Sequence, residues 1–155
     1  MSTKTYTLGL LQAKSFRFLK QKGNSLLSQY NLNTTEWAIL GLIYENKKST
    51  KTELSNILLF KKPFLTKIIS ELKKKKFLIE TRDKTDKRSE ILTLTNYGEK
   101  FVEKTEEEIS FFYNIFLSFF DAKELEAYIN FISKISKMSD SMKETRDKSD
   151  EVYKD

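Results

Sequence analysis

The chain has 155 residues, of which 39% are hydrophobic, 13% aromatic and 32% charged, and its formal net charge is +6. This length and apolar content suffice for one integrated domain with a packed core and exclude wholesale disorder. Because the chain has one Pro and four Gly, it lacks the turn residues of an all-β fold, and a helical protein is favoured.

Two helices are predicted in the first third of the chain. Apolar residues recur at helical spacing over about residues 6–30, although Gly23 weakens the centre of this helix. The second helix begins after Asn33 or Thr34, since either side chain can cap it, and Glu36 then lies in its first turn.

A short helix and a basic helix are predicted next. After a polar connector at residues 46–49, Thr50 and Glu53 have the spacing of a capping box, which predicts a helix to about residue 58. Pro63 is tolerated in the first turn of the following helix. Helical spacing predicts that the buried stripe of this helix consists of Leu65, Ile68, Ile69 and Leu72.

After the basic helix, the spacing of the apolar residues changes to that of strands and then returns to that of helices. Residues 77–82 and 90–95 are rich in β-branched and apolar side chains and flank a charged connector at 83–89, which predicts a β-hairpin. Helical spacing returns over residues 97–120, and Asp121 begins a last helix. Beyond Ser139 we expect a polar tail that frays.

The positive charge is concentrated in one part of the chain. Residues 61–88 hold 11 basic and four acidic residues, so their net charge is +7 and the other 127 residues sum to −1. A basic block in an otherwise neutral chain indicates a site for a polyanion. For the lysines at 73–76 we favour a simpler role, because cations at a helix C-terminus complement its dipole.

The residue types that are absent exclude several kinds of site. Without Cys or His, the chain has no disulfides, no thiol redox sensor, no His general base and none of the usual zinc sites. The acidic run at 106–108 therefore predicts a solvated helix face, and we expect neither a cofactor nor an enzyme. No apolar run spans a bilayer and no secretory signal is evident, which predicts a cytoplasmic protein.

Four segments in order resemble the MarR family of bacterial winged helix-turn-helix transcriptional regulators. The resemblance covers about residues 32–101 without a gap. The segments are Thr50-Lys-Thr-Glu-Leu-Ser-Asn-Ile-Leu58, Pro63-Phe-Leu-Thr-Lys67 through Ile68-Ile-Ser-Glu-Leu72, the Asp-x-Arg pattern at Asp86 and Arg88, and Leu94-Thr-Asn-Tyr-Gly98.

The resemblance implies a mainly α fold with a small β-hairpin wing. Residues 1–30 and 97–140 would be dimerisation helices, 31–96 the DNA-binding lobe and 141–155 a polar tail. A homodimer of this kind binds a pseudo-palindromic operator in double-stranded DNA, with its two recognition helices about 34 Å apart in successive major grooves. We therefore predict a dimeric, sequence-specific regulator, a repressor in the favoured version.

The resemblance also assigns residues to DNA. The predicted contacts are Lys61, Lys62, Phe64, Thr66, Lys67 and Ser70 on the recognition helix, and Lys84, Lys87 and Arg88 on the wing. Arg88 would enter a minor groove, and Asp86 would pair to hold the shape of the wing. Phe64 either contacts a thymine methyl group or packs against the neighbouring helix.

Two positions depart from the family pattern, which often has Gly where this chain has Leu59 and Lys76. A left-handed Lys76 costs on the order of 1 kcal/mol relative to Gly. The alternative is a recognition helix that continues further.

Two questions stay open at this point. The first is whether a small organic effector binds near Trp37, Phe112 and Phe116 and shifts the dimer away from DNA. Core packing is the favoured role for each of these three residues, and the alternative is a regulator that has no effector. The same fold also serves as a protein–protein interaction module. Such a module should carry an apolar patch, rather than lysines, on the face of the recognition helix.

Overall fold

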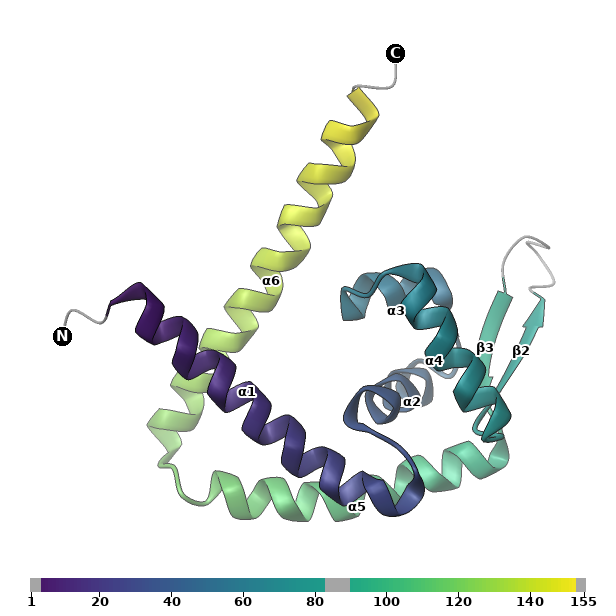
Figure 1. The fold of residues 1–155 in the computed structure, drawn as a ribbon, viewed down its shortest axis with the longest axis horizontal. Coiled ribbons are helices and arrows are strands. Elements are labelled where there is room, and N and C mark those ends of the chain that lie inside the picture. The colour runs from purple at the N-terminus through teal and green to yellow at the C-terminus, as the bar shows by residue number, and fades with distance from the viewer. Residues whose placement is uncertain (1–3, 83–89, 153–155) are drawn as a thin grey trace. The chain divides into compact units, whose positions relative to one another are not determined.

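The computed structural model describes residues 4–82 and 90–152, with side chains up to residue 139. These residues are mainly helical, with one small antiparallel sheet (Figure 1), which confirms the predicted fold class. The elements are α1 (Thr5–Leu27), the 3₁₀ turn η1 (Ser28–Tyr30), α2 (Thr34–Asn46), β1 (Ser49–Thr50), α3 (Lys51–Leu58), α4 (Lys62–Lys74), β2 (Leu78–Arg82), β3 (Glu90–Leu94), α5 (Asn96–Leu117) and α6 (Ala122–Val152). The chain divides into two compact units, residues 1–110 and 111–155.

Two capping boxes fix where α2 and α3 begin. The Asn33 side chain accepts hydrogen bonds from the backbone N–H groups of Thr35 and Glu36 at 2.9 and 3.0 Å, and the Glu36 carboxylate accepts one from the Asn33 N–H at 2.9 Å. At α3, Thr50 and Glu53 form the same reciprocal pair, at 3.2 and 2.6 Å. The predicted box at Thr50 is confirmed, and Asn33 rather than Thr34 caps α2.

The sheet has the strand order β1-β3-β2, and both pairs are antiparallel. The predicted hairpin is confirmed, with Leu78 opposite Leu94. The sequence does not predict β1, in which Ser49 lies opposite Leu92. The prediction that residues 46–49 form only a connector is therefore wrong at its last residue. A two-residue polar strand has no alternation of its own to detect, because it forms against an existing strand edge.

One cluster of buried side chains joins the helices to the sheet. In α4 the side chains of Leu65, Ile69 and Leu72 are 0%, 1% and 0% exposed, while Ile68 is half-buried, so the predicted stripe is confirmed. The rest of the buried hydrophobic cluster comprises Leu27, Leu32, Ile39, Leu40, Ile43, Leu54, Phe77, Leu78, Leu92, Leu94, Phe101, Val102 and Ile109.

The junction between the sheet and α5 requires a glycine. A Cβ atom on Gly98 would lie 2.4 Å from the carbonyl oxygen of Phe77. The hydroxyl of Thr95 accepts a hydrogen bond from the Gly98 N–H at 3.0 Å and donates one to the Lys76 carbonyl at 2.7 Å. This close approach explains the Leu94-to-Gly98 motif in physical terms, since any side chain at Gly98 would push the start of α5 away from the end of α4.

The C-terminus of α4 ends in a left-handed residue. Lys76 has φ 64°, and the N–H groups of Lys76 and Phe77 bond the carbonyls of Lys73 and Leu72 at 2.9 and 3.0 Å. This pair of bonds is a Schellman motif. Of the two alternatives from the sequence, the structure has the strained Lys76. Leu59 is also left-handed, with φ 58°.

The conformation at Lys76 gives a testable prediction. Lys76→Gly should raise the free energy of unfolding by about 1 kcal/mol, because glycine adopts a positive φ without the steric penalty of a Cβ. Lys74→Gly, inside the last turn of α4, is the control and should lower it by up to about 1 kcal/mol. Urea titrations measure both, and a Lys76→Gly protein no more stable than the wild type would contradict the left-handed end.

The second unit contains the end of α5 and the helix α6. Asp121 and Glu124 cap α6 reciprocally, with both hydrogen bonds at 2.9 Å, so the predicted restart at Asp121 is confirmed. The helix continues to Val152, past Ser139, where the sequence predicts that a frayed tail begins. Large apolar side chains exposed in this unit are Phe111, Tyr113, Ile115, Phe119, Phe120, Tyr128, Ile129, Phe131, Ile132, Ile135 and Met138.

Candidate nucleic-acid interface

The outer face of α4 carries the predicted DNA contacts of this helix. Burial of the opposite stripe leaves them exposed, and they are Lys61, Lys62, Phe64, Thr66, Lys67 and Ser70. The hydroxyl of Thr66 donates a hydrogen bond to the Lys62 carbonyl at 2.9 Å, which is a bond within the helix. Their placement on one exposed surface agrees with the sequence prediction, and their role in DNA contact stays a prediction.

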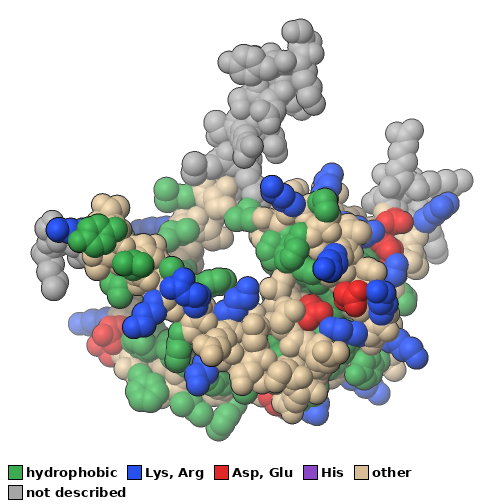
Figure 2. All heavy atoms as spheres, in the orientation of Figure 1, with side chains coloured by type: hydrophobic (Ala, Val, Ile, Leu, Met, Phe, Trp, Pro, Cys, Tyr) green, Lys and Arg blue, Asp and Glu red, His purple; other side chains and the backbone are tan. Residues whose placement is uncertain are grey.

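Apolar side chains share this surface with the lysines. Ile57, Leu59 and Phe64 are 53%, 57% and 51% exposed, and the rings of Phe60 and Phe64 pack edge to face with centroids 5.0 Å apart. We call Ile57, Leu59, Phe60 and Phe64 the apolar patch. Figure 2 shows hydrophobic and basic side chains next to each other over α3 and α4. Phe64 therefore both packs on a neighbour and exposes half of its surface.

The lysines at the end of α4 have acidic partners within the chain. Lys74 binds Glu71 of the same helix at 2.8 Å. Lys75 binds Glu36 at 2.8 Å and donates a hydrogen bond to the Asn31 carbonyl at 2.7 Å. The carboxylate that caps α2 thus also holds the end of α4. Lys73, Lys74 and Lys75 thus each bind an acid within the chain, and the predicted role of the lysines at 73–76 in complementing the helix dipole stays a prediction.

A second acid, Glu80 of β2, lies between lysines from two helices. Its carboxylate is 2.5 Å from the ammonium groups of both Lys51 and Lys73, although the Lys51 contact leaves Oε1 without a well-aligned hydrogen bond. Burial by itself would raise the pKa of Glu80, but the two lysines outweigh burial and lower this pKa from 4.5 to about 2. Lys51 also binds Glu90 of β3 at 2.9 Å, and its own pKa is raised by its two carboxylate partners.

The depressed pKa of Glu80 predicts how stability depends on pH. A carboxyl whose pKa is lower in the folded than in the unfolded protein stabilises the fold fully above about pH 4.5 and loses this contribution as the pH falls through about 2. The free energy of unfolding of the wild type should exceed that of Glu80→Gln at neutral pH by on the order of 1 kcal/mol. Urea titrations at steps of pH should show this difference shrinking between about pH 4.5 and pH 2. A difference that stays constant would contradict the ion pairs.

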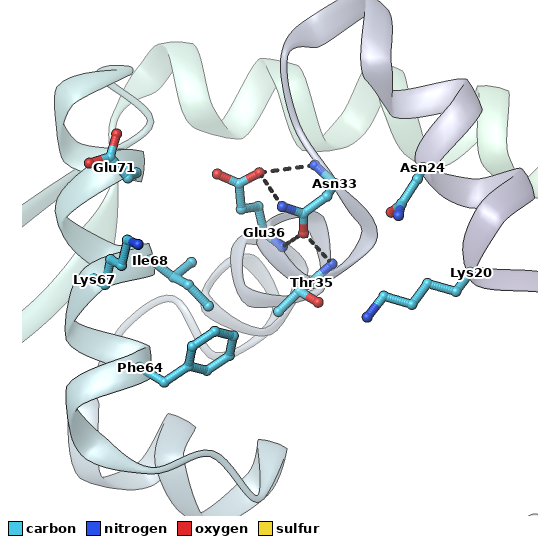
Figure 3. Close-up of a pocket in the computed structure, with 9 residues that line it drawn as sticks. All are labelled: Lys20, Asn24, Asn33, Thr35, Glu36, Phe64, Lys67, Ile68 and Glu71. Carbon is cyan, nitrogen blue, oxygen red and sulfur yellow. Dashed lines mark hydrogen bonds between the residues drawn. The ribbon is translucent and has the colours of Figure 1, made fainter. Parts of the chain in front are cut away.

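A pocket of about 470 Å³ lies between α1, the start of α2 and α4 (Figure 3). Its lining residues are Lys20, Asn24, Asn33, Thr35, Glu36, Phe64, Lys67, Ile68 and Glu71. Phe64 and Lys67 therefore belong both to this pocket and to the outer face of α4. The sequence does not predict the pocket, because its walls combine the neighbouring helices α1 and α2 with α4, which lies further along the chain.

The residues predicted to bind an effector lie elsewhere. Trp37 is half-buried in the first unit, where its indole N–H donates a hydrogen bond to the Thr105 hydroxyl at 3.1 Å. Phe112 and Phe116 belong to the second unit. None of the three lines the pocket described above, and their role in effector binding stays a prediction.

Four of the predicted site residues belong to the wing. Lys84, Asp86, Lys87 and Arg88 of the wing lie outside the described residues. Among residues 4–82 and 90–152, none of the helices has the length and apolar content needed to span a bilayer. The side chains of residues 4–82 and 90–139 contain no cluster of three or more carboxylates arranged to hold a metal ion.

Comparison with known proteins establishes the family. A family model described as transcriptional regulator SarA/Rot matches residues 21–107, which is more than half of the chain. The chain belongs to the SarA/Rot family of transcriptional regulators. The matched residues include α2, α3, α4, β2 and β3, so they contain the outer face of α4 and the apolar patch.

Individual relatives agree with this assignment. The SarA/Rot-family chain is 26% identical over 135 residues to the HTH-type transcriptional regulator FarR of Neisseria gonorrhoeae, covering 87% of this chain and 91% of FarR. A MarR protein from Peptoclostridium difficile superposes with a TM-score of 0.81 at 25% identity, over 92% of this chain and 93% of that protein. NadR in complex with 4-hydroxyphenylacetate superposes with a TM-score of 0.71 at 25% identity, over 88% and 96%. The predicted MarR-type regulator is confirmed.

Proposed function

We propose that this regulator binds duplex DNA by placing α4 in the major groove and acts as a repressor. The observation that supports this most directly is the set of lysines on the outer face of α4. Among the described residues, Lys61, Lys62 and Lys67 form no ion pair, whereas Lys73, Lys74 and Lys75 each bind an acid. Cations without an acidic partner are available to neutralise phosphates and release counterions.

The geometry of α4 suits base contacts as well as phosphate contacts. A single α-helix fits the major groove and brings side chains of its outer face to the edges of the bases. The outer face carries Thr66 and Ser70 beside the lysines and Phe64 at its N-terminal end. On the wing, Lys84, Lys87 and Arg88 would reach the adjacent backbone and minor groove, with Asp86 holding the wing's shape.

We further propose that the protein binds DNA as a homodimer on a pseudo-palindromic operator. Residues 1–30 and 97–140 would form the dimer interface, and 31–96 the DNA-binding lobe. In the single chain, α1 exposes Leu10, Phe16 and other large apolar side chains, and the second unit exposes the set given above. Large apolar side chains exposed together on a helix mark a protein interface.

An organic effector would act on the dimer by preferring a spacing of the lobes that does not fit DNA. NadR, which has the same fold, is solved with an aromatic carboxylate, 4-hydroxyphenylacetate. We propose the same class of ligand for this chain, with Trp37 as a candidate contact in the first unit and Phe112 and Phe116 as candidate contacts in the second. Because the chain has no Cys and no His, an organic molecule is favoured over an oxidant or a metal ion.

The apolar patch favours a second candidate function, a protein–protein interaction module. Exposed apolar side chains on the recognition face are the feature expected of such a module, and Ile57, Leu59 and Phe64 are each about half exposed. The exposed Lys61 and Lys62 lie between Phe60 and Phe64 in the sequence, however, and thymine methyl groups are apolar partners within DNA itself. The two experiments below separate these functions.

The first experiment measures the salt dependence of DNA binding. The dissociation constant of the wild type for a duplex selected from random DNA should rise steeply with salt concentration. Lys67→Gln should weaken binding to all duplexes and reduce the slope of log K against log salt by about one, because it removes one phosphate contact. Lys100→Gln, with the same loss of charge on α5, is the control and should leave the slope unchanged. Binding that is insensitive to salt would count against the DNA-binding proposal.

The second experiment tests Phe64 by removing methyl groups from the DNA. Replacing thymine with uracil in the selected half-sites should weaken wild-type binding by about three- to fourfold per methyl group contacted. Phe64→Ala should abolish this difference between thymine and uracil. Uracil placed in the flanking sequence is the control. If uracil has no effect at any position and a protein partner is found to bind the apolar patch, the result would contradict the DNA contact of Phe64 and support the interaction module.

A further inference from the structure

Glu80 is the outermost side chain of β2 that is withdrawn from solvent. Along β2, Leu78 is buried, Ile79 is exposed, Glu80 is half-buried, and Thr81 and Arg82 are exposed. On β3, Leu92 lies opposite Glu80, is buried and pairs with Ser49 of β1, so packing and the β1–β3 ladder hold that strand of the hairpin. On β2, which does not pair with β1, Glu80 contacts the helices through ion pairs.

The ionic contacts join both strands of the hairpin to the helix-turn-helix. Glu80 of β2 binds Lys73 in the last turn of α4 and Lys51, the first residue of α3, each at 2.5 Å. Lys51 also binds Glu90, the first residue of β3, at 2.9 Å. The Glu80 side chain is only 12% exposed, so its charge is screened less by water than that of a surface ion pair.

We propose that Glu80 is a positioning residue for DNA binding, because its bonds to Lys51 and Lys73 set the direction in which the β2–β3 hairpin projects from α4. The inference rests on the proposed function, since it concerns the same DNA-binding surface. The strand β2 lies at the edge of the sheet, and without the bonds to Glu80 its outer end would sample more directions, so that each wing contact with DNA would cost more entropy to fix. The bonds to Glu80 remove that cost before DNA binds.

The charges make this role distinguishable from simple electrostatics. The four groups Lys51, Lys73, Glu80 and Glu90 sum to zero, so Glu80→Gln leaves the cluster with a net charge of +1. If the carboxylate acts on DNA only through its charge, the substitution should strengthen binding to the polyanion. If Glu80 positions the hairpin, the substitution should weaken binding in spite of the added positive charge. The two roles predict opposite signs.

The experiment compares three variants with the wild type on the duplex selected by the wild-type protein. Glu80→Gln should raise the dissociation constant by about tenfold and lower the slope of log K against log salt, because wing phosphate contacts are lost. Glu80→Asp keeps the charge but is one methylene shorter, so it should also weaken binding. Glu71→Gln is the matched control: it makes the same charge change in an ion pair within α4 and should bind DNA at least as tightly as the wild type.

The salt slope separates positioning from loss of folded protein. A partly unfolded variant would lower the fraction of active protein without changing the slope, and circular dichroism of each variant measures that fraction. Glu80→Gln binding as tightly as the wild type, or Glu80→Asp behaving like the wild type, would overturn the positioning role while leaving the proposed function intact. A wild type that ignores all duplex DNA at low salt would overturn both.

Discussion

Burial of one stripe of α4 is the constraint on which the binding surface depends. Leu65, Ile69 and Leu72 are at most 1% exposed and recur one turn apart along the helix. Rotating the helix about its axis would expose at least one of them, at a cost of about 25 cal/mol for each Å² of apolar surface. Lys62 and Lys67 point outward because hydrophobic burial sets this rotation, and their own charge plays no part in it.

The positive charge of this region is divided between two tasks. The lysines at the start and middle of α4 form no ion pair among the described residues, whereas those at its end bind Glu71, Glu36 and Glu80. An ion pair within the protein offsets charge that would otherwise be available to phosphates. Glu71 and Glu80 are already counted in the net charge of the segment, so these ion pairs mainly determine where along α4 the unpaired lysines lie, at its start and middle.

The mixture of lysines and exposed apolar side chains distinguishes this surface from a purely electrostatic one. Lysines supply affinity that is independent of DNA sequence. Under the proposed function, the apolar patch around Phe64 would add contacts that depend on which methyl groups line the groove. Because the Phe60 ring packs edge to face against Phe64, part of the patch is held in place before any partner binds. The family assignment makes DNA the expected partner for both kinds of side chain.

Local patterns in the sequence determined the helices, the β-hairpin, the capping box at Thr50 and the outward face of α4, because spacing and capping act over a few residues. The motif from Leu94 to Gly98 was also evident, although its cause, contact with the Phe77 carbonyl, was not. Only the tertiary structure decided that Ser49 forms a strand and that Glu80 joins two helices to the hairpin. The same holds for the pocket between α1, α2 and α4. Each of these depends on groups far apart along the chain, and their meeting is set by how the helices pack on a shared core.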